Sequence, residues 1–530
     1  MKPFRFHLLL IFFISSFFSY SQDTTRIQLE RADSWEYDQS IMADVQRITG
    51  NVIMSHDSAY LYCDSAYLND EKNNVVAYGN VHIKISDTLN LFGDSLKYDG
   101  NTKVARIFSN VKLIDNQTVL TTDTLVFDRK TQIAQYDYWG KIVNDKNNLV
   151  SKHGYYYTDR KEFFFKEKVI LINPDYIINS DTLMYNTVTE VSYFLGPSTI
   201  VSKDKIDSIY CEKGWYDTRF DKARFRQNSI IWHEDQYLAG DSLYYERKSG
   251  FGQAFNHALL ADTTQHILLM GNYGELQRRK GYGFMVDSAV AVMIDKKDSL
   301  FMHSDTVKAI FDTSERIKTV HCYYKMKFFR DDLQGMSDSL VYHAADSTVT
   351  MYREPVVWSG KNQLTADSIT LTIRNGQADS LKMYNTAFII SEDDTNKFNQ
   401  IKGRNIKAKF RDNELYKINV IGNSETIYYV REEDSTLIGI NKALSSDMII
   451  FLEKNQVNSI TYLQNPSAVL YPEKDISPYD LKLKNFKWLK TNRPLVKEDI
   501  FIWDSSAEIK STNDKTTKIT DSPAEVFPDQ

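Results

Sequence analysis

The chain has very few cysteines. Of its 530 residues only 3 are cysteine, at Cys63, Cys211 and Cys322. Zinc sites and disulfide frameworks need cysteines that are closely or regularly spaced, and these three lie more than 100 residues apart. Two interpretations of them stay open. Two of the cysteines could form one disulfide, or all three could be small buried side chains, which is the usual place of a free cysteine.

The chain also lacks an excess of basic residues, and it lacks long hydrophobic runs. The sequence holds 64 Lys and Arg against 70 Asp and Glu, so it does not carry the positive charge with which proteins contact nucleic-acid phosphates. We therefore expect no nucleic-acid partner. Beyond the N-terminus no run approaches 18 consecutive apolar residues, so no further transmembrane helix is predicted.

Familiar catalytic motifs are missing as well. The sequence has no Gly-rich phosphate loop, no HExxH, no nucleophile elbow and no CxxC. We accordingly predict that the chain is not an enzyme, with no catalytic residues, no cofactor and no metal site.

The first residues, MKPFRFHLLLIFFISSFFSYSQ, follow the pattern of a secretory signal peptide. Lys2 and Arg5 precede an apolar core from about Leu8 to Phe18, and Ser19 and Ser21 are small residues at the positions that a signal peptidase reads. An uncleaved anchor helix is the alternative, but the apolar core is short for a membrane span. The pattern predicts a cleaved signal peptide and export from the cytoplasm.

Residues that favour β-structure are abundant. There are 33 Tyr and 29 Phe but only 10 Pro, and aromatic residues suit the pleated surface of a sheet. The composition indicates an all-β chain.

A short motif recurs with a period near 30 residues. It consists of a small residue, Asp, Ser or Thr, and then usually an apolar residue. Its aspartates are Asp64, Asp94, Asp123, Asp181, Asp241, Asp305, Asp338 and Asp367. The successive spacings are 30, 29, 58, 60, 64, 33 and 29, so the longer gaps are close to two periods. Because the aspartates are coupled to the repeat, we interpret them as corner residues and weigh catalysis or metal binding as the less favoured alternative.

A second motif lies midway between these aspartates. Its clearest copies are Tyr78-Gly79-Asn80-Val81, Phe108-Ser109-Asn110-Val111 and Trp139-Gly140-Lys141-Ile142. Around the first copy, alternate positions from Val75 to Ile85 are apolar or small, which is typical of a strand with one buried face. In the Asp-bearing segment the apolar positions change parity, since Leu89 and Leu91 precede Gly93-Asp94 whereas Leu96 and Tyr98 follow it. A bulge or corner produces such a change. We therefore predict an elongated antiparallel β-jellyroll or solenoid, built of kinked strands in two facing sheets.

These units resemble the OstA-like, or organic solvent tolerance, family, which includes the periplasmic lipopolysaccharide-transport protein LptA and the N-terminal periplasmic domain of LptD. The resemblance rests on Tyr78-Gly79-Asn80-Val81, Gly93-Asp94-Ser95-Leu96-Lys97-Tyr98 and Phe108-Ser109-Asn110-Val111-Lys112-Leu113. It implies a twisted jellyroll whose apolar interior shelters lipid acyl chains, and modules that stack into a bridge across the periplasm. The implied location is the periplasm, with or without association with the outer membrane. The implied partners are lipopolysaccharide or a related glycolipid, and other envelope transport proteins at the ends of the trough.

The repeats suggest a division of the chain. We predict a signal peptide over 1–21, an OstA-like module over 22–175, continued repeats over 176–300, looser repeats over 301–472, a C-terminal cap over 473–504 and a disordered tail over 505–530.

The candidate lipid-binding residues are those of the repeated apolar face: Ala77, Val81, Ile83, Leu91, Leu96, Ile107, Val111 and Leu113. If the two sheets splay, these side chains line a groove, and if the sheets close they are ordinary core. The predicted function is binding and relay of lipopolysaccharide along an apolar β-trough. The alternative is a structural envelope scaffold or adhesin that binds only protein partners.

Overall fold

The computed structural model describes residues 25–37, 44–295, 298–374, 376–412, 414–432, 434–453 and 456–503. The predicted signal peptide (1–21) and C-terminal tail (505–530) lie outside these residues. Antiparallel strands make up most of the described chain, which confirms the predicted all-β fold. The chain divides into two compact units, which meet between Glu234 and Asp235 and are called unit 1 and unit 2 below.

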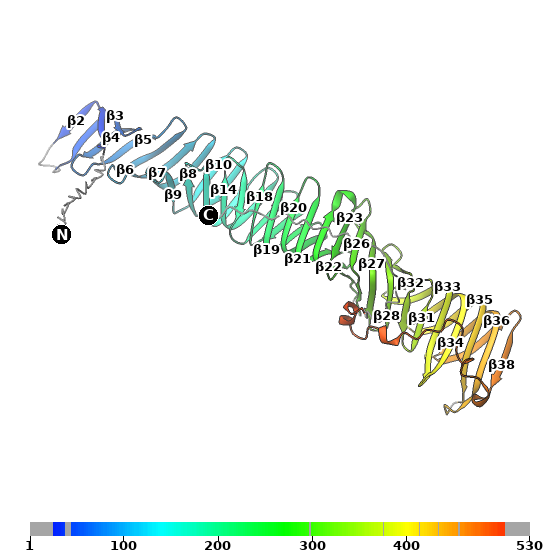
Figure 1. Cartoon of the computed structure of the whole chain (residues 1–530). Helices are drawn as coiled ribbons and strands as arrows, with labels where there is room; N and C mark the ends of the chain where they lie inside the picture. The colour runs from blue at the N-terminus through cyan, green and yellow to red at the C-terminus, as the bar shows by residue number, and fades with distance from the viewer. Residues whose placement is uncertain are drawn as a thin grey trace, which may run out of the picture. The chain divides into compact units, whose positions relative to one another are not determined.

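Unit 1 is a stack of antiparallel strands, drawn in blue to green in Figure 1. Its strands are β1 (Gln28–Arg31), β2 (Ser34–Tyr37), β3 (Gln46–His56), β4 (Ala59–Asn69), β5 (Asn74–Lys84), β6 (Leu89–Asp99), β7 (Val104–Asp115), β8 (Thr118–Asp128), β9 (Ile133–Tyr136), β10 (Gly140–Asn144), β11 (Asn147–Ser151), β12 (His153–Tyr157), β13 (Glu162–Ile172), β14 (Tyr176–Asn186), β15 (Val191–Phe194), β16 (Ser198–Ser202), β17 (Asp207–Cys211), β18 (Lys213–Asp217) and β19 (Lys222–His233).

Unit 2 continues in the same manner. Its strands are β20 (Gln236–Glu246), β21 (Phe251–Asp262), β22 (Ile267–Gln277), β23 (Tyr282–Val286), β24 (Val290–Met293), β25 (Leu300–His303), β26 (Thr306–Phe311), β27 (Ile317–Arg330), β28 (Leu333–His343), β29 (Thr348–Tyr352), β30 (Val356–Ser359), β31 (Asn362–Thr365), β32 (Ser368–Arg374), β33 (Gln377–Asp394), β34 (Lys397–Arg411), β35 (Glu414–Arg431), β36 (Leu437–Glu453), β37 (Gln456–Leu463) and β38 (Ser467–Tyr471). Four short 3-10 helices complete the described part: η1 (Arg278–Lys280), η2 (Glu473–Asp475), η3 (Lys490–Asn492) and η4 (Lys497–Phe501).

Each long strand bends at the repeated motifs. Between β5 and β6, Tyr78 pairs with Ser95 and Val81 pairs with Gly93, so two residues on β5 lie opposite Asp94 alone. Such a mismatch is a β-bulge, which bends the strand and re-aims its side chains. The predicted kink is therefore present, and it carries the chain from one half-sheet to the half-sheet that faces it.

The repeated aspartates bond the bends of successive strands together. Asn80 donates to the Asp64 carboxylate over 2.9 Å, and Asn110 donates to Asp94 over 2.7 Å. Both asparagines hold a positive φ, of 44° and 51°, which asparagine tolerates better than most residues. His257 and Asp241 repeat the contact 16 residues apart at 3.0 Å. These contacts give the aspartates the corner role expected of them.

Replacing Asp94 with Ala should lower the free energy of unfolding by about 1 kcal/mol, because one hydrogen bond at a strained bend is lost. Chemical denaturation of the full chain measures the change. Asp87→Ala is the control, since Asp87 lies in an exposed turn and contacts only Lys84 among the ion pairs of the described residues. An equal loss in both variants would contradict the corner role.

At some bends the long strand is interrupted and is replaced by two shorter strands. β9 pairs with β8 and β12, whereas β10 pairs with the other half of β8 and with β11. The break falls between them at Trp139, which has a φ of 46°. The second sequence motif thus marks bends as the first one does.

All three cysteines are free and buried. Of the two interpretations that the sequence left open, a disulfide or small buried side chains, the structure supports the second. Burial raises the pKa of each thiol to about 12.

Candidate lipid-binding interior

The eight residues predicted to line the groove all point into the interior of unit 1. Each has at most 6% of its surface exposed. They form continuous stripes across neighbouring strands, since Ile83 pairs with Leu91, which in turn pairs with Leu113. Ala77, Leu96 and Ile107 form a parallel stripe in the other half-sheet. The interior is therefore apolar along β5, β6 and β7, and its side chains are packed against one another.

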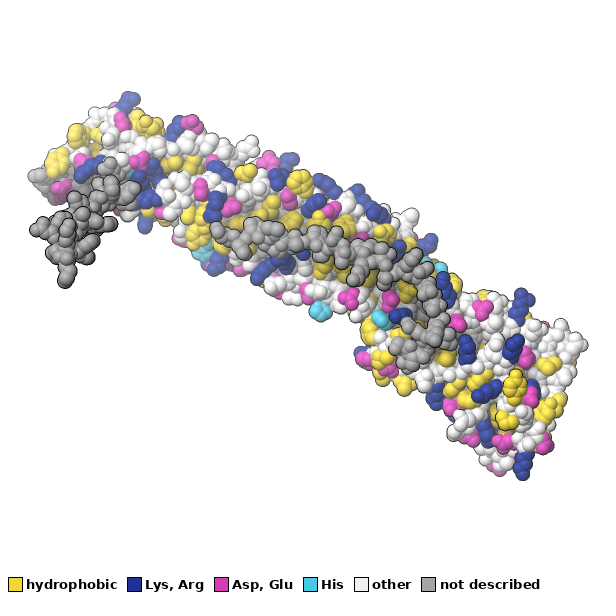
Figure 2. Space-filling view, in the orientation of Figure 1, with side chains coloured by type: hydrophobic (Ala, Val, Ile, Leu, Met, Phe, Trp, Pro, Cys, Tyr) yellow, Lys and Arg dark blue, Asp and Glu magenta, His cyan; other side chains and the backbone are white. Residues whose placement is uncertain are grey.

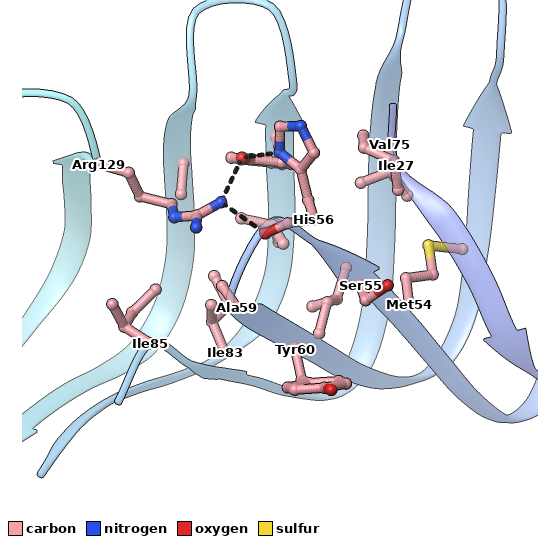
Figure 3. Close-up of a pocket in the computed structure, with 14 residues that line it drawn as sticks. Ile27, Met54, Ser55, His56, Ala59, Tyr60, Val75, Ile83, Ile85 and Arg129 are labelled. Atoms are coloured by element: carbon pink, nitrogen blue, oxygen red, sulfur yellow. Dashed lines mark hydrogen bonds between the residues drawn. The ribbon is translucent and has the colours of Figure 1, made fainter. Parts of the chain in front are cut away.

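An apolar cavity lies at the N-terminal end of this interior (Figure 3). It is lined by Ile27, Met54, Ser55, His56, Ala59, Tyr60, Leu61, Val75, Ile83, Ile85, Leu96, Tyr98, Ala105 and Arg129. Two of the eight predicted residues, Ile83 and Leu96, are among them, and the other six lie outside the cavity wall. Its volume is about 30 Å³. A cavity that binds benzene is about 150 Å³, so the interior must widen before it can take an acyl chain.

The cavity ends in a polar group of three side chains, joined by dashed lines in Figure 3. The His56 Nδ1 atom lies 2.6 Å from the Tyr98 hydroxyl. Arg129 donates to the same hydroxyl over 2.9 Å and to the carbonyl oxygen of His56 over 3.2 Å. Burial raises the pKa of Tyr98, so the phenol stays neutral beside the guanidinium. Sequence reasoning identified Tyr98 as part of the repeated motif but missed His56 and Arg129, because Arg129 is 73 residues from His56 and neither belongs to a motif.

An ion pair closes the interior next to this group. The Lys103 ammonium lies 2.8 Å from the Asp57 carboxylate, and the Arg129 guanidinium lies 3.8 Å from it. Asp57 is in the turn between β3 and β4, whereas Lys103 and Arg129 are in the turns that follow β6 and β8. The two rows of turns thus meet across the open side of the bent strands, along a line that we call the seam.

The hydrogen bond from Lys103, followed by that from Thr25, lowers the pKa of Asp57 from 3.8 to about 2. A depressed carboxyl pKa adds stability above the unfolded value, and that stability is lost as the pH falls through the folded value. We expect wild type and Asp57→Asn to differ by a constant amount above about pH 5, and the difference to vanish as the pH falls towards 2. Urea midpoints across this pH range measure it. A difference that persists at pH 2 would show that the carboxylate charge is not what holds the seam.

A second ion pair, between Lys161 and Asp115, lies farther along the seam, and we call it the latch. Lys161 and the Tyr156 hydroxyl each donate to Asp115 Oδ2 over 2.6 Å. The Asp115 side chain is fully buried, and that of Lys161 is 31% exposed. Burial, together with the neighbouring carboxylate, raises the pKa of Tyr156, which therefore remains a donor at all ordinary pH values. A buried carboxylate needs partners, and Lys161 and Tyr156 supply them to Asp115, so this latch connects the two rows of turns.

Aromatic side chains fill the interior beyond the cavity. Tyr136 reaches from one half-sheet to the other, where its hydroxyl lies 2.5 Å from Ser151 Oγ. Gly140 and Gly154 leave room for its ring, because a Cβ atom on either would lie 2.4 Å from a ring atom. Next to it, the rings of Tyr156 and Phe163 are stacked with centroids 4.0 Å apart. Within the aromatic runs 155–157 and 163–165, the buried side chains are those of Tyr156, Phe163 and Phe165.

Among the residues that the structure describes, no three His, Cys, Asp or Glu side chains are placed to hold a metal ion. Within the same residues no helix has the length and apolar character to cross a membrane. On the face shown in Figure 2, basic and acidic side chains are interspersed in each unit.

Comparison with known proteins finds a family model that matches the first part of the chain. Residues 24–181 match the family model described as OstA-like protein. Among solved structures, the chain is similar to LptH from Pseudomonas aeruginosa, described as the LptA homologous periplasmic component of the conserved lipopolysaccharide transport device. The identity is 16%, over 22% of this chain and 82% of that one, with a TM-score of 0.20. No curated protein matches the chain.

Proposed function

We propose that this chain, whose residues 24–181 are OstA-like, is a periplasmic protein that binds lipopolysaccharide or a related glycolipid and relays it along the interior of unit 1. The observation that carries the proposal is the continuous apolar interior of β5, β6 and β7 behind a seam of ion pairs. Burial of acyl chains in such an interior is favourable, at roughly 0.8 kcal/mol for each methylene group.

The seam suggests how the lipid gains access. The cavity is too small for an acyl chain, so the two rows of turns must part first. Parting frees Lys103 and Arg129 from Asp57, and both cations can then pair with an anionic phosphate. An amphiphile with acyl chains and a phosphorylated head thus satisfies both the apolar interior and the charged seam. Neither step uses catalytic chemistry.

Other envelope transport proteins are the proposed partners at the ends of the strand stack. Strands β2 and β38 are exposed along nearly all of their residues. A strand at the edge of a sheet presents unpaired backbone groups, to which the strand of another protein can add.

The deciding experiment places a photocrosslinking amino acid at Leu91 or Ile107 in living cells. Lys97 and Arg106 are matched controls, because they pair with each other on the same two strands and point outwards. We expect lipopolysaccharide adducts at Leu91 and Ile107 and none at the controls. Adducts with proteins alone would refute the proposal and favour a scaffold or adhesin that binds only protein partners.

A further inference from the structure

The C-terminal segment of unit 2 does not end at the last strand. After β38, residues 476–503, which we call the strap, run back past β34 and β31 to β27, as the orange and red segment of Figure 1 shows. The strap contacts Gln400 first, then Gln363, and finally Lys327, whose ammonium donates to the carbonyl oxygen of Ile502 over 2.6 Å. The segment predicted as a C-terminal cap therefore lies along the strand stack of unit 2.

Buried glutamines hold the strap in place. The amide of Gln400 donates to the carbonyl oxygen of Leu481 and accepts from the N–H of Leu483, both over 2.8 Å. Gln363 makes the same two bonds to Lys487 and Leu489, both over 2.7 Å. Gln363 and Gln400 are at most 1% exposed. Buried amides need partners, so these two side chains form a pair of clamps built for a backbone that lies beside them.

The same clamp occurs earlier in unit 2 with a different partner. There, Gln265 donates to the carbonyl oxygen of Ile317 and accepts from its N–H, over 2.8 and 2.7 Å. Gln265 lies in the turn before β22, and Ile317 begins β27, directly after the opposite row of turns. At Gln265 the two rows thus meet directly, whereas at Gln363 and Gln400 the strap takes the place of the opposite row. The seam of unit 2 is therefore open there by the width of one extended chain.

Apolar side chains line the opening beneath the strap. They are Phe388, Ile390, Phe398, Ile427, Tyr429 and Ile440. Ile476 and Leu483 of the strap are buried among them, and Leu481, Phe486 and Trp488 pack against their edge. Without the strap this surface would be an open apolar groove, which would bind an extended apolar ligand favourably.

The outer side of the strap is basic. Lys482, Lys484, Lys487 and Lys490 alternate with the apolar anchors and are all exposed. Basic side chains of this kind are attracted to anionic lipid headgroups, at about 1 kcal/mol for each residue near a lipid surface. The strap therefore covers an apolar surface and presents lysines to solvent, of which Lys490 is paired with Glu392 over 2.8 Å.

We propose that the seam of unit 2 is a second binding site for an acyl chain of an anionic amphiphile, and that the strap is its resident occupant, which the ligand displaces. The ligand class rests on the proposed function, whereas the groove and its occupant rest on the glutamine clamps. The acyl chain takes the place of Ile476 and Leu483, and the headgroup meets the lysines of the released strap.

A photocrosslinking amino acid at Phe398 tests this in the full chain. The Phe398 ring lies 5.3 Å from that of Phe486 and 5.2 Å from that of Trp488. Without lipid, we expect crosslinks to the strap, identified as a joined peptide by mass spectrometry. Added lipopolysaccharide should replace them with lipid adducts. In the double variant Gln363→Ala with Gln400→Ala, half-replacement should need at least about thirtyfold less lipid, since four hydrogen bonds to the strap are gone.

The control is Gln265→Ala, which removes the same clamp from Ile317 and should leave the lipid concentration for half-replacement unchanged. A strap crosslink that persists at saturating lipopolysaccharide in the wild type overturns the proposal, whatever the double variant does to folding. A parallel sample labelled at Leu91 separates the two proposals. Lipid adducts at Leu91 without any at Phe398 refute the second site alone, and adducts at neither position refute the proposed function as well.

Discussion

Replacing Lys161 with Ala should lower the stability of unit 1 by about 3 kcal/mol, because removing one partner of a buried ion pair leaves the other charge uncompensated. The Asp115 carboxylate is fully buried, and without Lys161 it would keep the Tyr156 hydroxyl as its strongest partner. Native-state hydrogen exchange of the full chain measures the change locally. Amides of β7 and β12, on the two sides of the latch, should lose protection.

The matched control removes both charges. In Asp115→Leu with Lys161→Met, no buried charge remains, so part of the loss should be recovered; the buried Tyr156 hydroxyl still loses its acceptor. The latch also makes a functional prediction, because Lys161→Ala frees the seam while the apolar interior is unchanged. Lipid adducts at Leu91 should therefore form faster in this variant than in the wild type, which keeps the latch. Equal rates in Lys161→Ala and the wild type would mean that the latch does not control access.

The corners of the fold could be predicted because each one is local. Asp94 and Asn110 are only 16 residues apart, and the change of parity after Gly93 shows in the sequence as soon as a strand is assumed. Alternation likewise identifies Leu91 and Ile107 as inward. Whether the two half-sheets splay or close does not follow from alternation, since the same apolar face serves either arrangement.

The closure of the seam could not be predicted, because it depends on contacts between distant turns. Lys161 reaches Asp115 across 46 residues, and Gln400 reaches Leu483 across 83. Lysine in a turn and glutamine near a strand end are ordinary in a sequence, and only the stacking of the strands gives them partners. The side chains that close the seam are thus ones that belong to no motif.

The inward side chains of unit 1 change from small to aromatic along the strand stack, and Tyr136 lies where this change occurs. Around the cavity the inward residues include the small side chains of Ala59 and Ala105, whereas Phe163 and Phe165 follow beyond Tyr136. The Tyr136 ring crosses the interior between the two half-sheets and is 1% exposed. A lipid that moves along the interior must displace this ring.

Tyr136→Ala should therefore cost about 3–5 kcal/mol of stability, as for other large aromatic side chains removed from a core, and at the same time lengthen the cavity. Ser151 keeps a partner in the carbonyl oxygen of His153, 2.9 Å away, so the new space loses no essential hydrogen bond. We expect the variant to bind small apolar probes such as benzene, which the 30 Å³ cavity of the wild type is too small to hold. Calorimetric titration measures the binding, and Tyr138→Ala, whose side chain is 61% exposed, is the control. If Tyr136→Ala stays folded but binds no probe, the half-sheets have collapsed onto the vacated space, and the same collapse would oppose the passage of an acyl chain.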